Sequence, residues 1–354
     1  MIKWLPKKYI DFQRLQQLLL ESNKTGMYTN YGPCVRTLEN MMHSFLELDD
    51  NKSVIATSSG TSAFDSIIAS ISTLHNIDRV RVRTQSFTFP TSAQTKYPNT
   101  TTICDVSKDG SIEPVFGEED IAVATTIFGS VPDLPLRISE CKKAGTILVL
   151  DNAASPLSYQ RGTNISNMGT ASIISLHHTK PIGFGEGGLV VIDKEYEETV
   201  RSFINFGLAN IEGTNIRKWE RHASNWRMSD ISAACIIQHI ERFQKKMQSI
   251  KSSQDFFIAS IPEQIEMFPS MHSSETVLSC LPVLFNRPVE TKYFEDRGIE
   301  AKKYYSPLST EECGNSLDFF ERIICFPSHE DMGRNDYKYM LETIKQFLGI
   351  QNHD

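Results

Sequence analysis

Residues 54–71 have the sequence VIATSSGTSAFDSIIASI, which contains the clearest structural pattern of the chain. The run Val54–Thr57 consists of β-branched and small residues and predicts a short buried strand. Beyond the turn residues Ser58, Ser59 and Gly60, apolar side chains recur with the i, i+3, i+4, i+7 spacing of an amphipathic helix. These side chains are Phe64, Ile67, Ile68 and Ile71. The stretch therefore predicts a strand that passes directly into a helix, which is the first half of a βαβ unit.

The same alternation continues to about Asp193. Six further runs predict strands, and they are Arg79–Arg83, Thr101–Asp105, Ile121–Ile127, Thr146–Leu150, Ala171–Ser175 and Gly188–Ile192. A helical pattern at Pro135–Lys143 lies between two of them. Short strands that alternate with helices are typical of a mostly parallel sheet, so we expect an α/β core.

The second half of the chain is dominated by helical patterns. One covers Glu195–Asn205, and a longer one runs from Ser229 to about Ile250. The longer pattern includes charged residues that we expect to be exposed, and these are Glu241, Arg242, Lys245 and Lys246. A strand pattern at Val277–Phe285 and a final helix near Tyr337–Phe347 indicate a smaller α+β unit.

The length of 354 residues suits two domains, at roughly 150 residues each. We expect a large α/β domain that includes the N-terminal segment, over residues 1–245. A small C-terminal α+β domain is expected over residues 246–354.

The composition argues against several classes of protein. With 43 acidic and 36 basic residues the formal net charge is −7, so the chain has no basic field to hold a nucleic-acid backbone. The N-terminal stretch MIKWLPKKYIDFQRLQQLL has polar residues beside every apolar run, which predicts neither a signal peptide nor a membrane span. Seven scattered cysteines without a C-x-x-C pair argue against a disulfide framework or a zinc site. We expect a cytoplasmic protein without a nucleic-acid or membrane partner.

Residues 183–188 have the sequence GFGEGG, which formally matches the dinucleotide fingerprint G-x-G-x-x-G. That fingerprint must follow a strand and open a helix, whereas here the strand pattern Leu189–Ile192 follows it. We therefore exclude a nicotinamide site. A close approach of the backbone to a bound group is the remaining reason for so many glycines near Lys180.

The stretch Ser59–Ala63 is a candidate phosphate site. A helix N-terminus offers free N–H groups, Gly60 permits a close approach, and the hydroxyl groups can donate hydrogen bonds. The stretch lacks the lysine of a Walker A loop. Serine and threonine are also ordinary N-caps, so a simple helix cap remains an alternative interpretation.

Lys180 and Asp151 each follow a predicted buried strand. The carboxyl end of a strand is where α/β enzymes place their chemistry, and Pro181 disfavours a helix at Lys180. A solvated surface lysine and a turn aspartate are the alternative interpretations. The neighbouring His177 and His178 would point in opposite directions on an extended segment, which argues against a metal site.

Six segments in a fixed order carry a family resemblance. They are SSGTSA (58–63), TF (88–89), Asp151, the pair Ser175 and Lys180, GEGG (185–188) and NWRMS (225–229). This order resembles that of the DegT/StrS-type nucleotide-sugar aminotransferases, which are pyridoxal-phosphate enzymes of fold type I. TNYGP (29–33) and KYYSPL (303–308) are similar to further segments of that family, so the resemblance covers about residues 29–308. Its most specific part is SLHHTKPIGFGEGG, residues 175–188.

The resemblance implies roles for the residues around the pyridoxal ring. Lys180 would form the Schiff base with pyridoxal phosphate and then move a proton between the substrate carbon and the cofactor. Asp151 would pair with the pyridine nitrogen, and Phe89 would stack on one face of the ring. The implied architecture is a three-layer fold with a seven-stranded, mostly parallel sheet and a smaller C-terminal domain.

The resemblance also implies how phosphate and substrate are held. The residues that would hold the cofactor phosphate are Gly60, Thr61, Ser62 and Ser175. Asn225 would reach this phosphate from the neighbouring subunit of a homodimer with shared active sites. Arg227 and Tyr305 would contact the substrate, and no metal is implied.

One position departs from the family pattern. Members commonly have Gln or His three residues after the aspartate, near the cofactor hydroxyl, whereas this chain has Ala154. Asn152 and Ser155 are nearby polar alternatives, so we expect the contact to be lost or shifted.

The implied reaction moves an amino group from L-glutamate to a nucleotide-linked 4-keto-6-deoxy sugar on dTDP or UDP. The product would be a 4-amino-4,6-dideoxy sugar for surface polysaccharide or glycan synthesis. Amination at C3 is the alternative. The arginines left open as ligands of the donor carboxylate are Arg287, Arg297, Arg322 and Arg334.

Two other functions share this fold. Sugar 3-dehydratases of the same superfamily replace the lysine by histidine, so Lys180 argues against that class. A regulatory protein that has lost catalysis is a further alternative, against which the joint presence of Lys180 and Asp151 argues.

Overall fold

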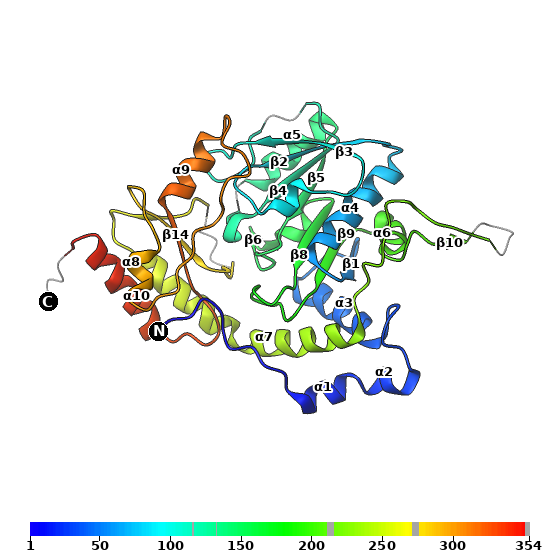
Figure 1. Ribbon diagram of the computed structural model, residues 1–354, viewed down its shortest axis with the longest axis horizontal. Helices are drawn as coiled ribbons and strands as arrows, with labels where there is room; N and C mark the ends of the chain where they lie inside the picture. Colours follow the sequence, from blue (N-terminus) through cyan, green and yellow to red (C-terminus); the bar gives the residue numbers. More distant parts are fainter. Residues whose placement is uncertain (115–116, 132, 211–215, 271–275, 351–354) are drawn as a thin grey trace.

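The computed structural model describes residues 1–114, 117–131, 133–210, 216–270 and 276–350. At its centre lies a seven-stranded sheet with the order β1-β9-β8-β5-β4-β2-β3 (Figure 1). Its strands are β1 (Lys52–Thr57), β2 (Val80–Gln85), β3 (Asn99–Cys104), β4 (Ile121–Thr125), β5 (Ile147–Asp151), β8 (Ala171–Ser175) and β9 (Gly188–Asp193). Strands β3, β2, β4, β5 and β8 pair in parallel, and β9 runs antiparallel to β8 and β1. The predicted α/β class with a mostly parallel sheet is therefore confirmed, and each predicted strand of this sheet is present.

Helices cover both faces of the sheet, which gives three layers. They are α3 (Pro33–Phe45), α4 (Gly60–Leu74), α5 (Leu134–Ala144), α6 (Glu197–Phe203) and α7 (Asp230–Ser260). Ile55 of β1 packs in one core with α4 and α6, whereas Val54 packs in another core with α3 and α7. Because successive residues of β1 enter different cores, this strand is apolar on both faces.

A second sheet has three antiparallel strands, β12 (Glu266–Met267), β13 (Leu281–Leu284) and β14 (Ile323–Phe326). The helices of this part are α8 (Lys292–Glu295), α9 (Gly314–Arg322) and α10 (Arg334–Phe347). The predicted strand Val277–Phe285 is shorter than expected, because residues 277–280 line a cavity instead. Helix α7 is longer than expected, since Phe257 in its last turns is buried in the core of this second sheet.

The N-terminal segment lies against both parts of the molecule. Ile2 pairs with Ile299, and the short helices α1 (Phe12–Leu18) and α2 (Leu20–Thr25) follow, with α1 alongside α7 (Figure 1). Helix α1 was not predicted from the sequence. It has only seven residues and none is fully buried, although Leu15 and Leu18 pack partly buried against the core that includes α7.

Contacts with the N-terminal segment change the exposure of two charged residues on α7. Glu241 and Arg242, which we expected to be exposed, are half-buried. Arg14 Nε donates to a Glu241 carboxylate oxygen at 3.0 Å, and the Arg242 guanidinium lies 4.5 Å from the centre of the Tyr9 ring. Lys245 and Lys246 are exposed as predicted. Within the described residues, no helix combines the length and the apolar character needed to cross a membrane.

The described structure also contains two short pairs of antiparallel strands. Strands β6 (Tyr159–Gln160) and β7 (Thr163–Asn164) form the first, and β10 (Ala209–Asn210) and β11 (Arg217–Lys218) form the second. The second pair projects from the large sheet on the side of α6 (Figure 1).

Candidate active site

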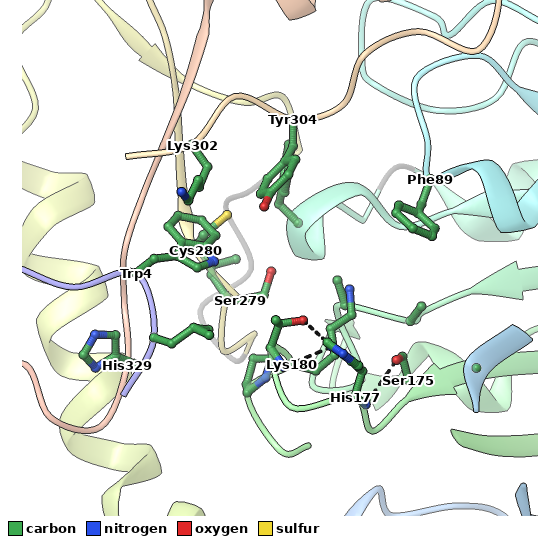
Figure 2. Close-up of a pocket in the computed structure, with 18 of the residues that line it drawn as sticks. Trp4, Phe89, Ser175, His177, Lys180, Ser279, Cys280, Lys302, Tyr304 and His329 are labelled. Atoms are coloured by element: carbon green, nitrogen blue, oxygen red, sulfur yellow. Dashed lines mark hydrogen bonds between the residues drawn. The ribbon is translucent and has the colours of Figure 1, made fainter. Parts of the chain in front are cut away.

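A cavity of about 860 Å³ lies at the carboxyl ends of the parallel strands. Thr125, Asp151 and Ser175, the last residues of β4, β5 and β8, line one side of it. The other side comes from the second sheet and the N-terminal segment, including Cys280 and Trp4 (Figure 2). This edge of a parallel sheet is the usual ligand position in α/β enzymes. The predicted site residues that line the cavity are Gly60, Thr61, Phe89, Asp151, Ser175, Lys180 and Tyr305.

The N-terminus of α4 opens into this cavity. Ser59 is the N-cap, and its hydroxyl accepts a hydrogen bond from the Ser62 N–H at 3.1 Å. The N–H groups of Gly60 and Thr61 are in the first turn, where no intrahelical acceptor exists, so they are available to an anion. A Cβ on residue 60 would lie 3.2 Å from the Cβ of Ser175, which accounts for the glycine. Ser62 itself is buried and lies outside the cavity lining.

Asp151 is held in place by two donors. The Ser92 hydroxyl donates to Asp151 Oδ2 at 2.5 Å, and the Ala153 N–H donates to Oδ1 at 3.0 Å. Phe89 has 60% of its surface exposed, although it lines the cavity, and Figure 2 shows its ring at the edge of the open space. An acceptor group and an open aromatic face are the features needed to hold a flat, protonated heteroaromatic ring.

Lys180 lies on the loop between β8 and β9, which folds back on itself. The Lys180 N–H donates to the His177 carbonyl at 2.8 Å, and the Gly183 N–H donates to the Lys180 carbonyl at 3.1 Å. Burial lowers the pKa of the Lys180 ammonium, while the nearby Asp151 charge acts in the opposite direction. A lowered pKa increases the fraction of neutral amine, the form that attacks a carbonyl carbon. Figure 2 shows Lys180 and Ser175 on the side of the cavity opposite to Tyr304.

The two histidines before Lys180 have local partners. His177 Nδ1 lies 2.8 Å from the Thr179 hydroxyl, and the His178 ring packs edge-on against Phe184 at 5.4 Å. In the described part of the chain, no group of three or more His, Cys, Asp or Glu side chains is placed to hold a metal ion.

Tyr305 closes the cavity from the side of the second sheet. Its ring stacks on Phe128, with the ring centres 5.4 Å apart and the planes at 6°. Burial raises the pKa of its phenol well above the usual value, so the hydroxyl is a neutral donor at physiological pH. The neighbouring Tyr304 meets Trp4 edge-on at 5.9 Å.

Asn225 and Arg227 lie outside this cavity. The Arg227 guanidinium donates to Asn225 Oδ1 at 3.0 and 2.8 Å, and it also bonds to Asn30. Its charged group lies 5.4 Å from the centre of the Phe206 ring. The structure therefore groups these two residues with the 29–33 segment on the surface, apart from the cavity formed by the same chain.

Ala154 lines the cavity, but neither expected polar substitute does. The Asn152 amide oxygen accepts from the Thr126 hydroxyl at 2.9 Å, and the Ser155 hydroxyl donates to the Thr126 carbonyl at 2.9 Å. Both side chains are fully buried in these contacts. Asn152 and Ser155 are therefore not placed to take over the contact of the missing Gln or His, and the cavity presents a methyl group at this position.

A family model described as the DegT/DnrJ/EryC1/StrS aminotransferase family matches residues 10–345. This chain belongs to that family. The membership confirms the resemblance found in the sequence and, with it, pyridoxal phosphate as the cofactor.

Two curated relatives are each 23% identical to this chain. Protein Rv3402c of Mycobacterium tuberculosis is 23% identical over 218 residues, which are 56% of this chain and 52% of the relative. The chain thus spans about half the length of the first curated relatives that it matches. A UDP-4-amino-4,6-dideoxy-N-acetyl-beta-L-altrosamine transaminase of Campylobacter jejuni is 23% identical over 278 residues, 69% of this chain and 72% of that protein.

The fold agrees with solved structures of the family. The putative sugar aminotransferase Spr1654 of Streptococcus pneumoniae, in its PLP form, superposes with a TM-score of 0.83 at 16% identity. The match covers 99% of this chain and 100% of that chain. The expected fold type is therefore confirmed.

The described residues fit pyridoxal phosphate. The unpaired N–H groups at the start of α4 suit its phosphate, and the glycine at position 60 leaves room beside Ser175. The oriented carboxylate of Asp151 suits the ring nitrogen, and Lys180 with its lowered pKa suits the aldehyde. The sequence did not predict that Ser92 and Ala153 orient Asp151. Ser92 is distant in the sequence and is brought to Asp151 only by the fold, and Ala153 contributes only its backbone N–H.

Proposed function

We propose that this chain moves an amino group from L-glutamate to a nucleotide-linked 4-keto-6-deoxy sugar, carried on dTDP or UDP. The product would be a 4-amino-4,6-dideoxy sugar for surface polysaccharide or glycan synthesis. The observation that carries the proposal is that Lys180, with its lowered pKa, shares one cavity with Asp151 and the N-terminus of α4. The Campylobacter relative, whose name describes a 4-amino sugar on UDP, supports C4 over C3.

Each group of the chain has a defined task in this proposal. Pyridoxal phosphate supplies an electron sink that allows the substrate carbon to lose and regain a proton. The Lys180 amine removes and returns that proton, and Asp151 keeps the ring nitrogen protonated. The N-terminus of α4 and the Ser175 hydroxyl would bind the phosphate, and Phe89 would stack on one face of the ring.

Lysines rather than arginines are placed to attract the anionic substrates. The four arginines left open by the sequence lie outside the cavity lining: Arg287, Arg297, Arg322 and Arg334. Three of them lie over aromatic rings, and Arg322 pairs with Asp318 at 2.6 Å. Lys3 and Lys302 line the cavity, and Lys3 is paired with Glu300 at 2.7 Å. We therefore infer that Lys302 attracts a carboxylate or phosphate of the substrates.

A homodimer with shared sites is part of the proposal. Asn225 and Arg227 lie outside the cavity of their own chain and hydrogen-bond to each other there, so we assign them to the cavity of a partner. Large apolar side chains near the projecting strands β10 and β11 are exposed, including Ile216 at 63% and Trp219 at 67%. Exposed apolar groups of this size are typical of a surface that a partner covers.

The proposal is tested by incubating the protein with L-glutamate and a panel of nucleotide-linked 3-keto and 4-keto sugars. Mass spectrometry and NMR identify the products, and Lys180→Ala is the control. A 4-amino sugar is expected. A 3-amino sugar as product would show that amination occurs at C3. A dehydrated sugar would show that the protein is a dehydratase. A wild-type protein that consumes no glutamate with any sugar would contradict the proposal.

A further inference from the structure

Lys8 contacts the loop that carries Lys180, although the function proposed above gives it no task. Its Nζ donates to the carbonyls of His178 at 2.7 Å, Lys180 at 2.7 Å and Gly183 at 2.6 Å. An ammonium group has three donors, so its whole hydrogen-bonding capacity is used on this one loop. One of the three acceptors is the carbonyl of Lys180 itself.

The backbone of the loop makes this arrangement possible. The N–H of His178 donates to Gly185 at 2.8 Å, and the N–H of Phe184 donates to Leu176 at 3.0 Å, so the loop is closed at its base. A Cβ on Gly183 would lie 2.1 Å from the His177 carbonyl, so only glycine permits this close turn. Carbonyl groups at the tip of the closed loop then converge on Lys8.

The segment that carries Lys8 is anchored on both sides of it. The Lys7 N–H donates to Asp331 at 2.7 Å, and the Asp11 N–H donates to Gln238 of α7 at 2.8 Å. These bonds hold Lys8 between α7 and the turn that joins β14 to α10. The backbone on both sides of Lys8 is thus bonded to other parts of the molecule, so Lys8 can restrain the loop.

We propose that Lys8 is a positioning residue, which fixes the loop so that the Lys180 side chain remains directed into the cavity. The proposal rests on the role of Lys180 in amino transfer. Lys8 is not itself part of the cavity lining, and it contacts Lys180 only at the backbone carbonyl, so its effect passes through the backbone of residues 178–183.

The proposal predicts a pH dependence. Burial lowers the pKa of Lys8 from 10.5 to about 8, and the charge of Glu330 opposes this shift. The other titratable groups that face Lys8 are His178 and His239, whose pKa values its charge lowers. A neutral amine has only two N–H donors, so one of the three carbonyls loses its bond as the pH rises through about 8.

Hydrogen exchange of the cofactor-free protein tests the restraint directly. In Lys8→Met, we expect the protection factors of amides in residues 176–187 to fall by about tenfold, with those of β8 unchanged. Lys7→Met is the matched control, because Lys7 is the adjacent residue and is exposed. Lys8→Arg keeps its charge at alkaline pH, so its loop protection should stay constant between about pH 7 and pH 9, whereas that of wild type falls.

Kinetics of the loaded enzyme separate positioning from general destabilisation. Lys8→Met should lower kcat by about tenfold and change KM for L-glutamate by less than about twofold. The proposal would be overturned if Lys8→Met had the same loop protection and kcat as wild type. It would also be overturned if the loop protection of wild type did not change between about pH 7 and pH 9. If wild type transfers no amino group, the proposed function fails, while the exchange experiment still decides whether Lys8 restrains the loop.

Discussion

His239 gives the protein a dependence on acid pH whose size follows from its surroundings. The side chain lies on α7 with 1% of its surface exposed, and its Nε2 is 2.8 Å from the carbonyl of Pro181, the residue after Lys180. Burial, and next the charge of Lys8, lower its pKa from 6.5 to about 4. The folded protein therefore keeps this ring neutral under conditions in which the unfolded chain protonates it.

The direction and size of the effect follow from proton linkage. Between pH 6.5 and about 4 the unfolded chain binds more protons at this residue, so the free energy of unfolding decreases as the pH falls. At about 1.36 kcal/mol per pH unit, the full loss is about 3 kcal/mol. About 2 kcal/mol of it is already lost at about pH 5.

Urea unfolding of the cofactor-free protein at about pH 7 and about pH 5 measures this loss. His239→Gln keeps a donor for the Pro181 carbonyl and removes the titrating ring, so its stability should fall by about 2 kcal/mol less than that of wild type. His43→Gln on α3 is the control, which removes a histidine far from the Lys180 loop in the sequence. Equal losses in wild type and His239→Gln would refute the reasoning.

Three substitutions test the assignment of the site. Lys180→Ala should abolish multiple turnover while the nucleotide sugar still binds, as followed by product formation and equilibrium binding; turnover near that of wild type would exclude this lysine. Asp151→Asn should lower kcat by about 10²-fold or more and weaken cofactor binding much less, because its charge is needed most when charge develops on the ring. A kcat near that of wild type would mean that Asp151 is a turn residue without a role at the cofactor ring. Mixed dimers of Lys180→Ala and Asn225→Ala should regain one intact site, and no gain over either parent would contradict shared sites.

The sequence could predict the main strands of the site because its signals there are local. Val54–Thr57 is a short run of apolar and β-branched residues followed at once by Ser58. Ala171–Ser175 is a short run with Ile173 and Ile174 at its centre, and it ends in Ser175. Since parallel strands end at the same edge of a sheet, residues that follow different strands meet in space. Asp151 and Lys180 therefore line one cavity, as their positions after predicted strands indicated.

The residues around Asp151 could not be predicted in the same way. Ser92 reaches the carboxylate from a short 3-10 turn, Pro90–Ala93, which has no hydrophobic period. Asn152 is adjacent to Asp151 in the sequence, yet it turns into the core because Thr126 on the neighbouring strand end binds it. A polar residue next to Asp151 in the sequence can face either the cavity or the core. Which of the two it faces depends on its hydrogen-bond partners from other strands.

The partners of the Lys180 loop could not be predicted from the sequence either, because they lie far from it along the chain. Two of these partners, Lys8 and His239, also differ in charge state. Side-chain donors from two distant segments bind carbonyls along the loop, Lys8 at residues 178, 180 and 183 and His239 at residue 181. Lys8 needs its proton to supply three donors, whereas His239 donates as a neutral ring, and each positive charge disfavours the other. Their pKa values of about 8 and about 4 leave a range between them in which Lys8 is charged and His239 is neutral. Within that range the loop keeps all four bonds without two facing cations, so the placement of Lys180 is expected to be most secure there.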